Sequence, residues 1–396
     1  MQHSKVIVGV TIAVVALLLI IGIIAMILFV PLKGKENTLT WSKNDVFDID
    51  KDVATIDIPS GKECKILQLS DLQLWMDGKD NDEALAVAQR LIEKEKPDLV
   101  VVAGDSVSGV TAPYLLKGFI QFMEEQAVAH NFYWAPVFGN HDNEIKATPN
   151  WSGDQYEAVS VANGGRCLFR KGPNNLGGTV GNYVVNIRQD GKIIQSVYMM
   201  DASSYMDYPQ DIVDYTGRGN SEKYITYQQI EWFEWNARNI AKVAGGIVPS
   251  MVVTHFAQYE SMLAFKQMVA GADGIYGNED DMKPDANGRY AVPEELGFGK
   301  FGYMPGVAQI QTGFIDCAKE YGLHTALYGH DHESDAVIRY EGVNYVYGLK
   351  TGPSPKPWNG AEYFGGTIIE FHAANASQPE IRHVIDQKAS DYWDKK

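Results

Sequence analysis

Residues 132–142 read Phe132-Tyr133-Trp134-Ala135-Pro136-Val137-Phe138-Gly139-Asn140-His141-Asp142, an apolar run that ends in a glycine and three polar side chains. The same arrangement recurs at four other places in the chain of 396 residues. These are residues 64–69 before Ser70-Asp71, 98–103 before Gly104-Asp105, 248–254 before His255, and 324–328 before Gly329-His330-Asp331-His332. Short apolar runs of this kind predict buried strands, so we expect the polar residues just beyond strand ends.

Helical patterns lie between these runs. Residues 82–95 place apolar side chains on one face and stop before Pro97, and Thr226 with Gln229 has the spacing of a capping box. Asp190-Gly191 between two apolar runs predicts a hairpin, so part of the sheet is antiparallel. Strands that alternate with helices, together with a hairpin, indicate a layered α/β domain, which we place at residues 63–385.

The flanks of this domain begin with a long apolar segment. Residues 6–30 carry no charged side chain, and as a helix they reach about 37 Å, enough to cross a bilayer. A cleaved signal peptide is the alternative, but its apolar region is roughly 7–15 residues long and ends in small residues, whereas this segment ends in Phe29-Val30-Pro31. The other flanks are a short tail at 1–5, a polar tether at 31–62 and a tail at 386–396.

We therefore expect a single-pass membrane protein that keeps residues 6–30 as a signal anchor. Two possible N-glycosylation triplets, Asn150-Trp151-Ser152 and Asn375-Ala376-Ser377, favour a lumenal or extracellular place for the domain.

Charge restricts the classes of partner. Lys and Arg number 34 against 50 Asp and Glu, a net charge of −16. A surface this acidic repels nucleic acid, so no nucleic-acid partner is expected. If the protein handles phosphate, metal ions are the obvious means of neutralising it. Cys64, Cys167 and Cys317 lie far apart and form neither a disulfide framework nor a CxxC motif, so we interpret them as ordinary thiols.

The polar residues at the predicted strand ends suit a metal site. Ligands of open α/β sheets gather beyond the carboxyl ends of the strands. Six side chains there could bind metal, namely Asp71, Asp105, Asn140, His255, His330 and His332. Two carboxylates, an amide and three imidazoles suit Mn²⁺, Fe²⁺, Zn²⁺ or Mg²⁺. If one carboxylate is shared, two ions can lie roughly 3.5–4 Å apart, the spacing that binds a phosphoryl group during in-line displacement.

These motifs, in this order, resemble those of the calcineurin-like metallophosphoesterase superfamily from about residue 65 to residue 371. Finer features look like its purple-acid-phosphatase-like branch: residues 134–137 before the Gly-Asn-His-Asp motif, residues 224–225 with 229–233, and the segment 329–335. The resemblance implies a four-layer α/β/β/α sandwich with mixed sheets around a dinuclear metal centre.

The resemblance also implies roles for individual residues. Asp71 and His332 would hold the first ion, and Asp105 would bridge to the second. The second ion would be held by Asn140, His255 and His330. His141 would stay off the metals and protonate the leaving oxygen, with Asp142 helping to orient its imidazole.

The chain departs from the family pattern in two places. The first family motif is usually Asp-x-His, but here it reads Asp71-Leu72-Gln73, so the third residue offers only an amide oxygen. That harder ligand would favour Mn²⁺, Fe²⁺ or Mg²⁺ over Zn²⁺ in the first position, with Mn²⁺ preferred overall. Ser106-Val107-Ser108 follows Asp105 where purple acid phosphatases carry a tyrosine, so we expect a colourless protein without ferric iron.

Three functions are candidates for a chain with these residues. The first is a membrane-anchored phosphoesterase with two divalent ions, in which water activated between the ions attacks a phosphate ester and His141 acts as general acid. The second is a non-catalytic or single-metal binding protein on the same fold, because Gln73 replaces the usual histidine. The third, a zinc peptidase, is disfavoured because the sequence contains no HExxH motif.

Overall fold

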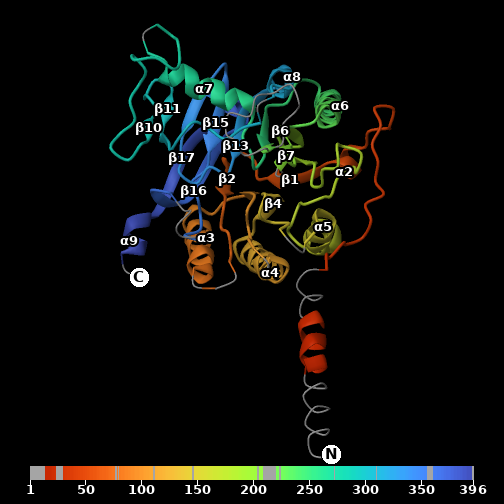
Figure 1. Ribbon diagram of the computed structural model, residues 1–396. Helices are drawn as coiled ribbons and strands as arrows, with labels where there is room; N and C mark the ends of the chain where they lie inside the picture. Colours follow the sequence, from red (N-terminus) through yellow and green to blue (C-terminus); the bar gives the residue numbers. More distant parts are fainter. Residues whose placement is uncertain are drawn as a thin grey trace, which may run out of the picture.

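The computed structural model describes residues 14–23, 30–75, 78, 80–109, 112–144, 147–202, 205–207, 220–222, 224–271, 273–308, 310–354 and 360–394. Two large sheets form the centre of the fold, and helices lie on the outer side of each (Figure 1). The prediction of a mixed α/β fold with several sheets is confirmed.

One sheet has five strands in the order β17-β16-β2-β3-β4. Their bounds are Glu380–Lys388 for β17, Tyr363–Phe371 for β16, Cys64–Leu69 for β2, Leu99–Ala103 for β3 and Tyr133–Val137 for β4. Strands β2, β3 and β4 are parallel, whereas β16 is antiparallel to both of its neighbours. The three apolar runs predicted as strands in this part of the chain therefore end at one edge of one sheet.

The other sheet has eight strands in the order β1-β5-β6-β9-β13-β15-β14-β11. The bounds are Ala54–Ile58 for β1, Tyr183–Gln189 for β5, Lys192–Met199 for β6, Ser250–Val253 for β9, Leu323–Tyr328 for β13, Val343–Tyr347 for β15, Val337–Tyr340 for β14 and Gly297–Phe298 for β11. Strands β6, β9, β13 and β15 are mutually parallel. The predicted hairpin is confirmed as the antiparallel pair β5–β6, whose turn places Asp190 and Gly191 in the left-handed region at φ 52° and 74°.

Helices cover the outer faces of both sheets. On the five-stranded sheet lie α3 (Asn81–Glu95), α4 (Ala112–His130) and α5 (Pro149–Ala158), and on the eight-stranded sheet lie α6 (Tyr227–Ala244), α7 (Tyr259–Val269) and α8 (Phe314–Glu320) (Figure 1). The predicted capping box of Thr226 and Gln229 begins α6. One apolar core joins the facing sides of the two sheets with α3 and α4, and a second joins the eight-stranded sheet to α6, α7 and α8.

Smaller elements complete the described chain. They are α2 (Ile49–Asp52), α9 (Ala389–Trp393), two 3-10 turns at Val161–Asn163 and Ala373–Asn375, and the strand pairs β7 (Tyr205–Asp207) with β8 (Asn220–Glu222) and β10 (Tyr290–Ala291) with β12 (Lys300–Phe301).

The flanks differ from the prediction in two respects. Residues 54–58, predicted as part of an irregular tether, form β1 and pair with β5 along its length. The C-terminal tail expected from residue 386 instead continues β17 to Lys388 and ends in α9. In β1 and in residues 386–388, regular structure comes from pairing with a neighbouring strand, which a local sequence pattern does not reveal.

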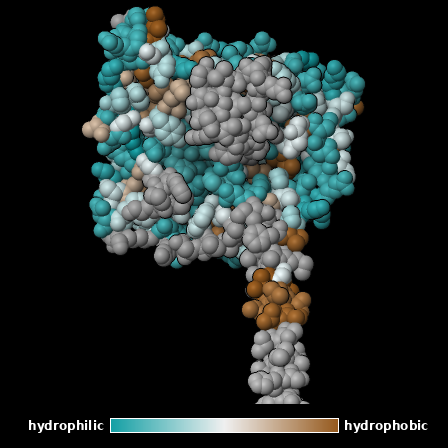
Figure 2. Space-filling view, in the orientation of Figure 1, coloured by the Kyte–Doolittle hydropathy of each residue, from teal (hydrophilic) through white to brown (hydrophobic). Residues whose placement is uncertain are grey.

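The predicted membrane segment at 6–30 lies mostly outside the described residues. Within it, residues 14–23 are helical, and their apolar side chains are exposed and stand out from a largely hydrophilic face in Figure 2. None of the helices in the described ranges has both the length and the apolar character of a membrane span.

Candidate metal centre

The candidate site lies where the two sheets bring their strand ends together. Residues after β2, β3 and β4 come from one sheet, and residues after β9 and β13 come from the other. The backbone turns sharply at these ends, since Asp71, Gln73, Asp105 and His330 all have positive φ values of 46–70°. Non-glycine residues rarely adopt this conformation, and it concentrates at functional sites where the surrounding structure enforces it.

Asp71, Asp105 and His332 form one half of the cluster. One ligand atom from each lies within 4.8 Å of the other two. His332 Nε2 is 3.3 Å from Asp71 Oδ1, a buried oxygen that accepts no hydrogen bond within the described part of the chain. Burial alone would raise the pKa of Asp71, but His332 and His255 outweigh it and lower this pKa to about 2. An ionised, unpartnered oxygen beside an imidazole nitrogen suits a bound cation.

Asn140 and His255 form the other half of the cluster. The Ala103 carbonyl can only accept, so His255 donates to it from Nδ1 at 2.8 Å. His255 Nε2 then faces Asn140 Oδ1 at 3.0 Å and Asp105 Oδ2 at 3.5 Å. Burial would lower the pKa of His255, but Asp105 raises it to about 9. At this pKa Nε2 carries a proton that faces two oxygen acceptors, and a metal ion that binds the three atoms would displace this proton.

His330 connects the two halves. Its backbone N–H donates to Asp71 Oδ2 at 3.1 Å, and its ring lies 5.2 Å from that of His255. Burial together with the charge of His255 lowers the pKa of His330 to about 3, so its imidazole is neutral. The structure thus brings together Asp71, Asp105, Asn140, His255, His330 and His332, and this donor set fits two divalent ions.

His141 lies at the edge of this cluster. Its backbone N–H donates to Asp105 Oδ1 at 2.8 Å, and its Nε2 is 3.9 Å from Asp105 Oδ2. About a third of the side chain is exposed. Burial would lower the pKa of His141, but Asp105 and Glu144 raise it to about 9, so the imidazole carries a proton at neutral pH.

The carboxylate beside His141 is Glu144, not Asp142 as the sequence analysis expected. Glu144 Oε1 contacts His141 Nδ1 at 2.7 Å, while its other oxygen accepts from the Gly109 N–H at 2.8 Å. Asp142 points inward and accepts from the backbone N–H groups of Asp105, Val107 and Gly139 at 2.6–3.1 Å. Asp142 therefore orders the turns that carry the site rather than the imidazole.

Gln73 is engaged at both ends of its amide. Its Nε2 donates to Asp105 Oδ2 at 3.2 Å, and its Oε1 accepts from Lys350 Nζ at 3.1 Å. Lys350, which sequence analysis missed, is 2% exposed and also donates to the Asp71 carbonyl at 2.6 Å. Burial lowers the pKa of Lys350 to about 8 despite the nearby carboxylates of Asp71 and Asp105. Lys350 belongs to no recognisable sequence motif. It follows β15, and β15, unlike β2, β3, β4, β9 and β13, is not followed by a predicted metal ligand.

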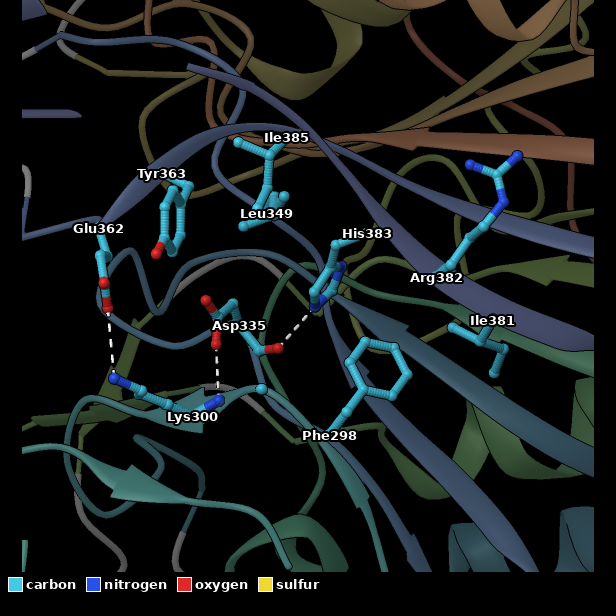
Figure 3. A pocket seen from close by; sticks show the side chains of 11 residues that line it. Phe298, Lys300, Asp335, Leu349, Glu362, Tyr363, Ile381, Arg382, His383 and Ile385 are labelled. Carbon is cyan, nitrogen blue, oxygen red and sulfur yellow. Dashed lines mark hydrogen bonds and ion pairs between the residues drawn. The ribbon is translucent and has the colours of Figure 1, made fainter. Parts of the chain in front are cut away.

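A separate cavity of about 520 Å³ lies between β11–β12 and β16–β17 (Figure 3). None of the predicted site residues lines it. Asp335 connects it to the site, since Asp335 ends the segment that carries His330 and His332. The Asp335 carbonyl accepts from His383 Nε2 at 2.6 Å, and its carboxylate accepts from the Lys300 N–H at 2.6 Å. The cavity wall thus anchors that segment from behind.

A two-sheet α/β fold with carboxylate, amide and imidazole donors at its strand ends defines a class of metal-dependent hydrolases. The model of the family "Calcineurin-like phosphoesterase" matches residues 64–334, a range that contains every predicted ligand and His141. The chain belongs to this family.

The chain is also similar to individual known proteins. The chain is 22% identical over 324 residues to the probable inactive purple acid phosphatase 29 of Arabidopsis thaliana. The matched region covers 72% of this chain and 71% of that protein. It is 27% identical over 162 residues to the phosphatase DCR2 of Saccharomyces cerevisiae, or 36% of this chain and 27% of that one. A solved dimetal phosphatase from Danio rerio is similar over 82% of this chain and 99% of its own, with 8% identity and a TM-score of 0.45.

Proposed function

We propose that the protein is a phosphoesterase that hydrolyses a phosphate ester with the help of two divalent metal ions. The observation that carries this proposal is the position of His141, a protonated imidazole at the exposed edge of a buried cluster of metal-binding atoms. A cluster that only stabilised the fold would need no proton donor at its edge.

In this proposal, Asp71 and His332 hold one ion, and Asn140, His255 and His330 hold the other. Asp105 is shared, since its carboxylate lies near ligand atoms of both groups. When bound, the ions neutralise charge on the phosphoryl oxygens and activate the attacking water. The mixture of oxygen and imidazole donors favours Mn²⁺, with Fe²⁺, Mg²⁺ and Zn²⁺ as the other candidates.

The chain's own residues would position and move the proton. Asp105 fixes His141 through the backbone N–H bond, so that the imidazole faces the cluster. Glu144 holds Nδ1 and leaves Nε2 free to donate to the leaving oxygen. General acid catalysis by a positioned side chain contributes roughly 10²–10⁴-fold to the rate.

The test uses the purified full-length chain in detergent, with Mn²⁺ and either p-nitrophenyl phosphate or its bis-ester. We expect hydrolysis that falls roughly 10²–10⁴-fold in His141→Ala and is abolished in Asn140→Ala. The control is His372→Ala, which removes an exposed histidine outside the site that lies 3.6 Å from Glu63. Activity that survives both site substitutions would refute the proposal.

A binding protein without turnover is the second candidate. Two observations favour it: both ends of the Gln73 amide are engaged by protein groups, and one relative is named an inactive phosphatase. Metal analysis separates the two candidates. One ion per chain and no hydrolysis would support the binding protein, whereas two ions with hydrolysis would exclude it.

We further propose that residues 6–30 anchor the protein in a membrane, with the domain on the lumenal or extracellular side. The uncharged sequence of this segment and the exposed apolar side chains of residues 14–23 support the anchor. Extraction of cell membranes with carbonate should leave the full chain in the membrane pellet. A chain recovered in the supernatant would contradict the anchor, and protease protection of the domain in sealed vesicles tests its side.

A further inference from the structure

Lys350 is a buried cation that the proposed reaction does not use. It follows β15, two residues after Gly348, and its side chain runs toward the strand ends where the metal cluster lies. Its ammonium donates to the Asp71 carbonyl at 2.6 Å and to Gln73 Oε1 at 3.1 Å. Both acceptors are neutral. Among the residues that the structure describes, no carboxylate lies within ion-pair distance of this ammonium.

An unpaired buried charge acts on its surroundings because little solvent screens it. Lys350 lies on the side of Asp71 and Asp105, since it donates to the Asp71 carbonyl and its other acceptor, Gln73, donates to Asp105 Oδ2 at 3.2 Å. His332 lies beside the same Asp71 at 3.3 Å. These are the three groups whose ligand atoms lie within 4.8 Å of one another. The positive charge therefore acts on one half of the metal cluster, while Asn140, His255 and His330 form the other half.

Lys350 also determines what Gln73 can do. The oxygen is the metal-binding atom of the Gln73 side-chain amide, and one of its lone pairs accepts the hydrogen bond from Lys350. The amide nitrogen is directed at Asp105 instead. An ion between Asp71, Asp105 and His332 would thus compete with the Lys350 ammonium for the Gln73 oxygen and would meet a positive charge behind its ligands.

We propose that Lys350 sets the metal affinity of this half of the centre: its ammonium, held by Asp71 and Gln73, weakens divalent-ion binding at Asp71, Asp105 and His332, so that the two ions bind with unequal affinity. The inference rests on the proposed two-ion function and adds a specificity-determining residue to it. The ion at Asn140, His255 and His330 is the tightly held one, and the other exchanges readily with the medium.

The experiment titrates Mn²⁺ alone into metal-free full-length protein in detergent and follows free Mn²⁺ by its electron paramagnetic resonance signal. We expect two binding events in the unmodified chain, separated in dissociation constant. Lys350→Met removes the charge and keeps the length of the side chain, and should tighten the weaker event by about tenfold or more. The tighter event should change little.

Two control variants isolate the charge. Lys350→Arg keeps a cation and should leave both dissociation constants within about twofold. Lys171→Met removes another buried lysine, which is 6% exposed and pairs at 2.6 Å with Asp154, a residue outside the cluster; it should also leave both constants unchanged. If Lys350→Met does not fold, Lys350→Gln removes the charge while keeping an N–H donor for the Asp71 carbonyl, and the same tightening is expected.

The outcomes distinguish this inference from the proposed function. Two binding events that are unaffected by removal of the Lys350 charge would overturn the inference and leave the proposed function standing. A chain that binds no Mn²⁺ at all would overturn both. Two events of unequal affinity, of which only the weaker responds to Lys350→Met, support both.

Discussion

Glu144 holds the proposed acid through a contact of 2.7 Å with His141 Nδ1, and this contact gives a pH-dependent prediction. Asp105 and Glu144 together raise the pKa of His141 against the effect of burial. A general acid works while protonated, so activity is lost as pH rises through this pKa. Removing one of the two carboxylates lowers the pKa, and the loss of activity then begins at lower pH.

For Glu144→Gln we expect the high-pH limb of kcat/KM to move down by about one pH unit, since an adjacent opposite charge shifts a pKa by this order. The measurement is the pH–rate profile of the Mn²⁺-loaded enzyme with p-nitrophenyl phosphate. Glu63→Gln, which alters an exposed carboxylate 3.6 Å from His372, should leave the profile in place. A high-pH limb that does not move in Glu144→Gln would show that this carboxylate does not tune the acid.

Single residues also show where sequence reasoning stops. The residue types at the strand ends predicted which side chains gather, because strand ends of parallel neighbours meet at one edge. They did not predict which carboxylate orients His141. Asp142 is its neighbour in sequence, but the turn directs it toward three backbone N–H groups, while Glu144 returns to the ring. Lys350 was missed because its distance in sequence from Gln73 hides their contact.

At the scale of elements, the turn after β13 packs closely against the turn after β2. A Cβ atom added at Gly329 would lie 2.6 Å from the Ala103 carbonyl oxygen and closer still to Ser70 Oγ. Real side chains do not approach backbone this closely, so the two strand ends would have to move apart. The predicted ligands Asp71 and His330 lie on those two strand ends. The site can therefore keep its shape only if residue 329 has no side chain.

Gly329→Ala should therefore destabilise the protein by about 1–3 kcal/mol, as overpacking of tight sites does. It should also weaken Mn²⁺ binding, which a purely structural defect elsewhere would not do. Urea unfolding and Mn²⁺ titration measure the two effects. Gly118→Ala in α4, where an added Cβ meets nothing within 4 Å, is the control and should be neutral or stabilising by up to about 1 kcal/mol. Equal effects of the two substitutions would contradict the argument.

The elements were predictable to different degrees. Strand β3 was evident because it is buried on both faces and therefore continuously apolar, and β2 and β13 are largely buried and mostly apolar. Strand β1 was hidden in the predicted tether because its residues alternate between buried and exposed, and its pairing partner β5 lies more than 120 residues away. Edge strands take their structure from a neighbour, which a local pattern does not reveal.

At the scale of the whole molecule, residues 31–52 form a strap along the domain rather than a free tether. Backbone groups of Trp41 exchange hydrogen bonds with the Asn175 side chain at 2.8 and 3.0 Å, and Asn37 donates to the Gly172 carbonyl at 2.9 Å. The aromatic side chains of Trp41 and Phe47 pack against Trp235 of α6 with ring centroids 6.0 and 5.3 Å apart. A cavity of about 990 Å³ remains between the strap and the domain, and Trp235 is among the residues that line it.

Trp235→Ala should release the strap while leaving the metal centre intact. We expect a loss of about 2 kcal/mol in the free energy of unfolding, less than for a fully buried tryptophan, and faster proteolytic cleavage within residues 31–52. Mn²⁺ binding should not change, because the strap contributes no ligand. Tyr227→Ala on the same helix removes an aromatic side chain that is 63% exposed and should affect neither measurement. If the strap stays resistant to protease in Trp235→Ala, its hydrogen bonds to the domain hold it without the aromatic cluster. Residues 31–52 would then have to be counted as part of the folded domain.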